Sequence, residues 1–179
     1  MAEQLGLGFG KLVRTYSRTD LALLTPNDIF AAADEDLLGT LREDRRIERK
    51  PATIHGAELG EYFSMWANTP SDGGLIVLGQ RDDGTYSGCA SLQQVQLNDL
   101  EKAGLYHCPN AQLESRRIAV TRPDGSKDFV LLIRVQYHER TVVRDVRGKA
   151  FARIGDSKVL LTSDQIRELE IAKGEVDLE

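Results

Sequence analysis

The sequence has little cysteine, few aromatic residues and no long hydrophobic run, and each shortage narrows the class of protein. Cys89 and Cys108 are its only cysteines among 179 residues, and they do not form a CxxC pair. This content indicates a reducing compartment rather than a disulfide scaffold. His107 precedes Cys108, but a tetrahedral zinc site needs a second pair of ligands elsewhere, so the spacing argues against structural zinc.

A membrane span requires about 18 or more consecutive apolar residues, and no run in this chain approaches that length. The first twenty residues also lack the basic and then apolar plan of a signal peptide. We therefore expect no membrane association and a cytoplasmic location.

The chain also lacks an excess of positive charge, since its net charge is −5. This charge argues against a protein that coats nucleic acid with its whole surface, because phosphate binding depends largely on Lys and Arg contacts. Two segments are nevertheless basic: residues 41–50 carry five basic and three acidic side chains, and residues 140–158 carry six and two. Each is either a solvated charged face or part of a local anion-binding patch.

The apolar fraction of 41% and the length fit one globular domain. Thr25, Pro26 and Asp28 predict the start of a helix, and Leu59, Phe63 and Trp66 share one face of another. Further helices are expected over 92–105 and after Thr162, and paired strands over 74–79 with 85–89, 117–121 with 127–137, and 142–146 with 149–154. This alternation predicts an α+β fold with a mixed, largely antiparallel sheet containing hairpins, and with helices packed on it.

The glycine-rich stretch 67–88, ANTPSDGGLIVLGQRDDGTYSG, first suggests a phosphate loop. It lacks the pattern GxxxxGK[ST], and its glycines flank a strand instead of joining a strand to a helix. The stretch therefore predicts a buried strand over 74–79 and a turn at Asp83 and Gly84. Ile47 to Lys50 precede Pro51 and are expected to be extended, which places Glu48 and Lys50 on one face.

Several short motifs occur in a characteristic order: IERK (47–50), ANT (67–69), GG (73–74), IVLG (76–79), DDG (82–84) and FARIGDS (151–157). Together they resemble the Schlafen-type Alba-like domain. On this basis we expect an N-terminal arm over 1–24, the domain over 25–160, and a C-terminal helix and tail over 161–179. The arm contains three glycines and is expected to be irregular or to add an edge strand.

The resemblance implies a nucleic-acid-binding domain, found in regulators of transcription or in defence proteins. Some relatives cleave structured RNA with three carboxylates, which would correspond to Glu43, Glu48 and Asp82 here. Such carboxylates bind Mg²⁺ or Mn²⁺, which activates water, while Lys50 would neutralise charge on the phosphate. Arg49 stands where the family usually has an aromatic residue, and Gln80 and Arg81 stand where an apolar residue and an acid are commoner. The added charge of Arg49 and Arg81 favours phosphate contact, whereas losing the acid weakens metal binding.

Three hypotheses follow from the sequence. The first is a DNA- or RNA-binding domain that contacts phosphates mainly through Arg45, Arg46, Arg49, Lys50 and Arg153, with both basic segments forming one groove. The second is a ribonuclease dependent on Mg²⁺ or Mn²⁺, with Glu43, Glu48, Asp82 and Lys50 as its catalytic residues. The third is a non-catalytic module that self-associates as a homo-oligomer through its sheet edges. His55, a lone histidine in a loop, is either exposed or a general base.

Overall fold

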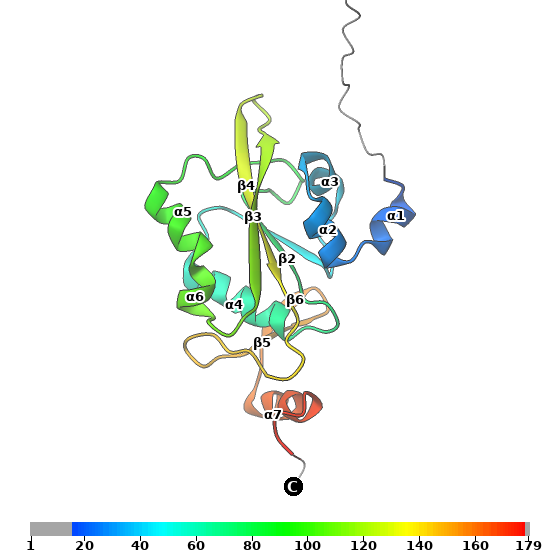
Figure 1. The fold of residues 1–179 in the computed structure, drawn as a ribbon, viewed down its shortest axis with the longest axis vertical. Helices are drawn as coiled ribbons and strands as arrows, with labels where there is room; N and C mark the ends of the chain where they lie inside the picture. The colour runs from blue at the N-terminus through cyan, green and yellow to red at the C-terminus, as the bar shows by residue number, and fades with distance from the viewer. Residues whose placement is uncertain (1–15, 178–179) are drawn as a thin grey trace, which may run out of the picture.

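A computed structural model describes residues 16–177, and it places a mixed sheet between two layers of helices (Figure 1). The helices of these residues are α1 (Arg18–Leu23), α2 (Pro26–Ala32), α3 (Glu35–Thr40), α4 (Gly56–Ala67), α5 (Gln94–Glu101), α6 (Ala103–His107) and α7 (Ser163–Ala172). The strands are β1 (Ile47–Lys50), β2 (Gly74–Leu78), β3 (Leu113–Thr121), β4 (Lys127–Val135), β5 (Phe151–Ile154) and β6 (Ser157–Leu160).

The main sheet has the strand order β1-β2-β4-β3. β1 runs parallel to β2, whereas β4 is antiparallel to both β2 and β3. The predicted mixed, largely antiparallel sheet is therefore confirmed, as is the hairpin that joins β3 to β4. All five residues of β2 are buried, as expected for an apolar strand with a layer of helices on each face.

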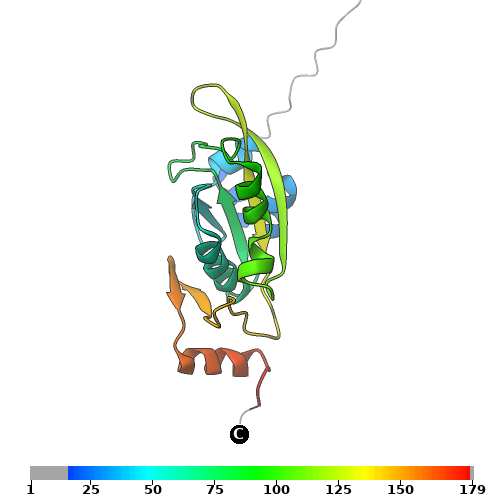
Figure 2. The ribbon, with the colours of Figure 1, turned by 90° about the vertical axis from the view of Figure 1, so that its left-hand side faces the viewer.

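The sheet divides the apolar interior into two cores. On one face, Phe63 and Trp66 of α4 pack with Ile76 and Ile133 of the sheet, and α5 and α6 extend this layer. On the other face, α2 and α3 cover the remaining sheet residues, with Ile29 and Leu38 among the side chains of that core. Figure 1 shows the sheet edge-on between the two layers, and in Figure 2 α5 and α6 lie in front of it.

Two predicted helix starts are confirmed by their caps. The Thr25 side chain accepts a hydrogen bond from Asp28 N, and the Asp28 side chain accepts one from Thr25 N. Thr162 and Gln165 make the same reciprocal pair at α7. Each such cap stabilises its helix by about 1 kcal/mol. The described part of the expected N-terminal arm contains the helix α1, not an edge strand; residues 1–15 lie outside the described residues.

The expected return strand over 85–89 does not form. Gln80 and Tyr86 make a single bridge, and no strand follows it. The Gly79 carbonyl oxygen instead accepts hydrogen bonds from both Ser87 N and Gly88 N, at 2.8 and 2.9 Å. The chain between β2 and α5 is therefore a tightly closed loop, which we call the 79–90 loop.

The expected pairing of 142–146 with 149–154 is also wrong. Arg144 and Ala150 form one isolated bridge, while β5 pairs forward with β6. The reason is that the Asp145 carboxylate accepts from Arg147 N and Lys149 N, both at 2.9 Å, which curls this segment into a loop. The predicted helix over 92–105 is divided between α5 and α6 at Lys102.

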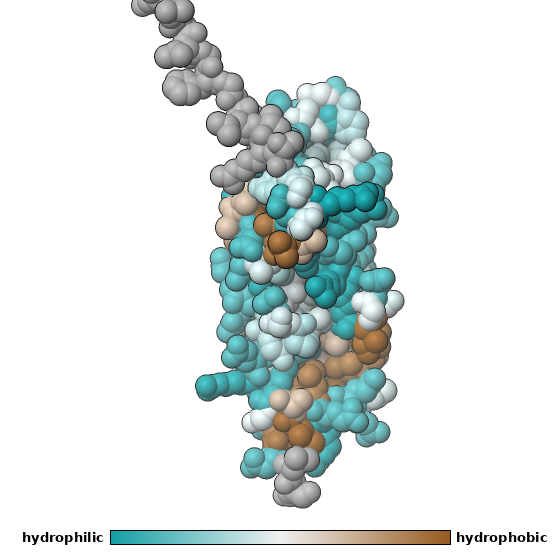
Figure 3. Space-filling model, turned by 90° about the vertical axis from the view of Figure 1, so that its right-hand side faces the viewer, coloured by the Kyte–Doolittle hydropathy of each residue, from teal (hydrophilic) through white to brown (hydrophobic). Residues whose placement is uncertain are grey.

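The β5–β6 hairpin and α7 lie at one end of the molecule, below the main sheet in Figures 1 and 2. Lys173 at the end of α7 joins this part to the body: its Nζ donates to the carbonyl oxygens of His138 and Thr141, at 2.6 and 2.9 Å. Apolar residues gather in the lower part of the face in Figure 3, and the hairpin leaves Ile154 and Leu160 about half exposed. Within residues 16–177, no helix is both long and apolar enough to cross a membrane.

Candidate functional site

A cleft of about 600 Å³ lies at the carboxyl ends of the two parallel strands β1 and β2. In open sheets, ligands bind preferentially beyond the carboxyl ends of parallel strands, because the connections diverge there. We call it the strand-end cleft. Its lining residues are Arg49, Lys50, Pro51, Gln80, Arg81, Asp82, Asp83 and Ser87. The structure therefore brings three of the predicted site residues, Arg49, Lys50 and Asp82, around one cavity.

The far wall of this cleft is the 79–90 loop, and Asp128 of β4 fixes it. Asp128 Oδ1 accepts from Cys89 N at 3.0 Å and from Ala90 N at 2.9 Å. Burial acts to raise the pKa of Asp128, but these backbone donors and the Arg122 guanidinium lower it below the ordinary value. Gly88 has φ +76°, and a Cβ there would lie 2.1 Å from Asp128 Cγ, so only glycine permits this contact.

The inner side of the strand-end cleft is formed by two buried polar side chains, Arg49 and Gln80, which are 5% and 2% exposed. Arg49 Nη1 donates to the Asp82 carbonyl oxygen at 2.9 Å, and Nη2 donates to the Leu41 carbonyl oxygen. Gln80 Nε2 donates to the Leu38 carbonyl oxygen at 2.9 Å. Arg49 thus holds the loop in place instead of facing solvent, as a surface phosphate contact would require.

Gln80 Oε1 and Arg49 Nε have no hydrogen-bond partner within residues 16–177. Buried polar atoms are normally paired, since leaving one unpaired costs about 1–3 kcal/mol. One unsatisfied acceptor and one unsatisfied donor therefore belong to residues that line the same cavity.

Two cationic side chains reach the solvent side of the cleft. Arg81 is exposed. Its Nη1 makes two long hydrogen bonds within its own loop, to Thr85 Oγ1 at 3.3 Å and to the Tyr86 carbonyl oxygen at 3.4 Å. Lys50 is partly buried, with its Nζ 2.8 Å from Glu48 Oε1. Burial acts to lower the pKa of Lys50, but the hydrogen bond and charge of Glu48 raise it above the ordinary value, so Lys50 is cationic.

Arg153 lies on the same face of β1 as Glu48 but is not free to bind a ligand. Its Nη1 is 3.1 Å from Glu48 Oε2, its guanidinium lies 5.1 Å from the Trp66 ring centroid, and its side chain is 7% exposed. Arg153 therefore attaches the β5–β6 hairpin to β1 and α4. Glu48 stands between two cations, Lys50 and Arg153, as expected from the alternation of side chains along a strand.

Arg46 is engaged in a different part of the molecule. Its Nη1 donates to the carbonyl oxygens of Leu21 and Leu24, both at 2.7 Å, and its Nη2 is 2.6 Å from Asp44 Oδ2. These contacts lie beside α1 and α2, whereas Arg153 contacts α4 on the opposite face of the sheet. The two basic segments therefore do not form the single groove that we expected. Arg45 is exposed and has no ion pair within the described chain.

The three carboxylates of the predicted metal site have other partners. Glu43 Oε1 accepts from Arg49 N at 2.6 Å, Glu48 pairs with Lys50 and Arg153, and Asp82 is exposed on the loop. Between residues 16 and 177, no group of three or more His, Cys, Asp or Glu side chains is arranged so that it could hold a metal ion. The ribonuclease hypothesis thus gains no support from the geometry and stays a prediction.

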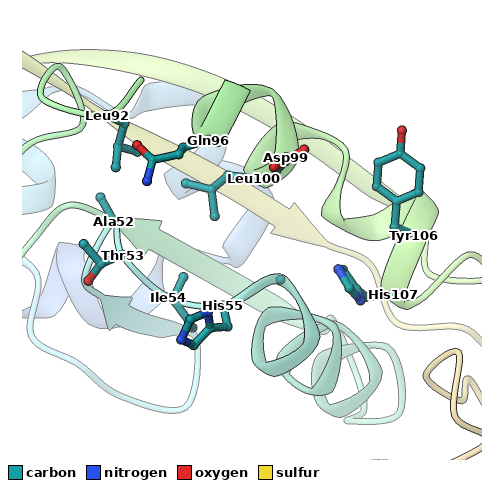
Figure 4. Close-up of a pocket in the computed structure, with 11 residues that line it drawn as sticks. Ala52, Thr53, Ile54, His55, Leu92, Gln96, Asp99, Leu100, Tyr106 and His107 are labelled. Atoms are coloured by element: carbon teal, nitrogen blue, oxygen red, sulfur yellow. The ribbon is translucent and has the colours of Figure 1, made fainter. Parts of the chain in front are cut away.

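A second cleft, of about 560 Å³, lies between the loop after β1 and the helices α5 and α6 (Figure 4). We call it the α5 cleft. Its lining residues are Ala52, Thr53, Ile54, His55, Gly56, Leu92, Gln96, Asp99, Leu100, Tyr106 and His107. Sequence reasoning considered His55 and His107 separately and did not find this cavity.

A sequence signal for the α5 cleft was present in the glycines of α4. A Cβ at Gly56 would lie 2.5 Å from His107 Nε2, and one at Gly60 would lie 2.7 Å from His107 Cβ. Glycines four residues apart lie on one face of a helix and permit close approach of a neighbour. Here that neighbour is α6, and the approach brings His107 to the start of α4.

Cys108 is buried, which raises the pKa of its thiol to about 12.

The fold and the two clefts define a mixed α+β domain with one cavity at the ends of β1 and β2 and a second beside α5 and α6. The chain matches no protein-family model and no curated protein sequence. Among solved structures it is similar to the DIP2311 protein from Corynebacterium diphtheriae, with a TM-score of 0.51 and 18% sequence identity. The likeness covers 82% of this chain but only 31% of that protein, and at this identity it shows the fold alone.

Proposed function

We propose that this chain is a nucleic-acid-binding domain that contacts the phosphate backbone at the strand-end cleft. The observation that carries the proposal is the placement of Lys50 and Arg81 on one cavity of a chain whose net charge is −5. A pair of cations on a concave surface concentrates positive potential there, although the protein as a whole repels polyanions.

One of the two acidic residues that line the cleft, Asp83, is engaged by its own loop. Asp83 Oδ1 accepts from Thr85 N at 2.9 Å and from Thr85 Oγ1 at 2.6 Å, and these hydrogen bonds lower the pKa of Asp83. The Asp83 carboxylate is thus used to close the turn. Lys50 stays charged mainly because of Glu48, and Tyr62 is a second hydrogen-bonding partner. A lysine ammonium has three donor hydrogens, so one of them is left for a ligand.

Of the phosphate-contacting residues predicted from the sequence, the proposal retains Lys50, and it adds Arg81. Arg46, Arg49 and Arg153 support the site indirectly, since each holds a neighbouring element in position. Contact with phosphates alone carries no sequence information, so we expect weak discrimination between nucleic-acid sequences.

The test is a titration of labelled DNA and RNA with the full chain over a series of salt concentrations. Binding should weaken steeply as salt rises. Arg81→Ala and Lys50→Ala should each reduce the slope of log affinity against log salt by about 0.7–0.9, the value for one phosphate contact.

The matched control is Arg167→Ala, which removes the same charge from an exposed position on α7 that has no ion pair among the described residues. It should leave the slope unchanged. A flat salt response, or equal slopes for Arg81→Ala and Arg167→Ala, would contradict phosphate contact at the strand-end cleft.

A further inference from the structure

The two clefts meet along one chain segment. Arg49, Lys50 and Pro51 line the strand-end cleft, and the next residues, Ala52 to Gly56, line the α5 cleft. Neighbouring Cα atoms are about 3.8 Å apart, so the cavities adjoin at the step from Pro51 to Ala52. When the phosphate of a ligand lies beside Lys50, the chemical groups attached to that phosphate can reach the α5 cleft.

The α5 cleft differs from the strand-end cleft in its chemistry. Two buried apolar side chains line it, Ile54 and Leu100, which are 9% and 6% exposed. Figure 4 shows them on opposite sides of the cavity, Ile54 from the loop and Leu100 from α5. Its volume falls within the range of about 300–1,000 Å³ that is typical of sites for small organic groups.

Polar side chains from α5 supply a donor and an acceptor. Gln96 Oε1 accepts from Gln93 N at 2.9 Å, which leaves the amide nitrogen of Gln96 as a donor. Asp99 follows three residues later on the same helix face and is exposed, with no ion pair within residues 16–177. An amide donor and a carboxylate acceptor that line one cavity suit the polar edge of a nucleobase, which presents both donors and acceptors.

Aromatic rings complete the cavity. His55 and His107 lie at the start of α4 and the end of α6, and Tyr106, which is 53% exposed, stands on α6 at one end of the cleft (Figure 4). Unpaired bases are recognised by stacking on His and Tyr rings combined with hydrogen bonds to their edges.

We infer that the α5 cleft binds an unpaired nucleobase whose own strand places a phosphate in the strand-end cleft. This inference rests on the proposed function and specifies its ligand as a single-stranded nucleotide unit. A base held in a duplex cannot enter the cavity without being unpaired and unstacked, which weakens binding. The chain therefore binds single strands in preference to duplexes.

The experiment compares the affinities of four labelled probes for the full chain: a short single-stranded oligonucleotide, the same strand with abasic sites, the corresponding duplex, and a free mononucleotide. Stacking of one base is worth about 1–3 kcal/mol, so the base-bearing strand should bind about 5-fold or more tightly than the abasic strand. The duplex should also bind more weakly than the single strand.

Two variants remove the recognition groups. Tyr106→Ala and Asp99→Ala should bring the affinities for the base-bearing and abasic strands closer together. Because removal of a negative charge strengthens binding to any polyanion, the control for Asp99→Ala is Glu168→Ala, an exposed residue of α7. This control should shift the affinities for both strands equally.

The outcomes separate the two proposals. Equal, salt-dependent binding of base-bearing and abasic strands overturns the base-binding inference but leaves phosphate contact intact. Failure to bind any strand overturns both. Tight binding of the mononucleotide, reduced by Tyr106→Ala, supports the base cleft and identifies a free nucleotide as its source of ligand.

Discussion

Arg49 Nη1 donates to the carbonyl oxygen of Asp82 at 2.9 Å, which joins the end of β1 to the loop that follows β2. Both residues were expected to act at a surface, one on phosphate and one on a metal ion. Their contact instead lies in the wall of the strand-end cleft, which Arg81 and Lys50 also line.

Arg49 should contribute to stability through its backbone contacts. In Arg49→Met the carbonyl oxygens of Leu41 and Asp82 lose their donor, and we expect the free energy of unfolding to fall by about 2–4 kcal/mol. Urea denaturation measures the change. The control Arg45→Met alters an exposed arginine and should stay within about 0.5 kcal/mol of the wild type. Equal stabilities of the two variants would contradict the role of Arg49.

Two glycines with positive φ should respond differently to the same substitution. Gly88 has φ +76° and no space for a Cβ beside Asp128, whereas Gly125 has φ +83° and nothing within 4 Å. Gly125→Ala introduces only backbone strain, which should lower the free energy of unfolding by about 1–2 kcal/mol. Gly88→Ala should lower the free energy of unfolding by more than this, because the 79–90 loop must also move away from Asp128. Thermal unfolding of both variants checks this order, and a smaller loss for Gly88→Ala would contradict the packing of the loop.

Asp128 should make stability depend on pH at the acid end. Its pKa is lowered in the folded protein, so its contribution is complete above the unfolded value near 3.8 and is lost as pH falls through the folded value. Asp128→Ala leaves the N–H group of Ala90 without an acceptor, while Cys89 N keeps the Phe129 carbonyl oxygen, and the substitution should cost about 1–3 kcal/mol at pH 7. The gap to the wild type should narrow at pH 3. A gap that is constant with pH would contradict the lowered pKa.

Lys173 should make stability depend on pH at the alkaline end. Burial lowers its pKa to about 8, although the Glu175 carboxylate acts to raise it. Between pH 8 and the ordinary value of 10.5, the unfolded chain binds more protons at this residue than the folded one, so stability should rise with pH. Lys173→Met removes this contribution. The denaturant midpoints of the wild type and the variant are measured from pH 7 to 10. The midpoint of the wild type should rise relative to that of the variant as pH increases, and a difference that is constant with pH would contradict the lowered pKa.

The sequence predicted the elements whose signals are local. Thr25 and Asp28 cap α2 because both partners lie within one turn, and the apolar run of β2 is buried as its composition indicates. The β3–β4 hairpin follows from its turn residues. Over 85–89 the local prediction was wrong: Ser87 N and Gly88 N both donate to the single Gly79 carbonyl oxygen, which closes a loop, and Cys89 N donates to the distant Asp128 carboxylate.

The candidate site shows the same division between local and distant information. The sequence by itself determined that Glu48 and Lys50 share a face of an extended segment and that Asp83 and Gly84 form a turn. Only the tertiary structure decided that Arg49 is buried, that Arg153 packs on Trp66, and that Arg46 faces α1. The physical reason is that a charged side chain is fixed by partners from 8 to 105 residues away, and the spacing of residues along the chain does not specify those partners.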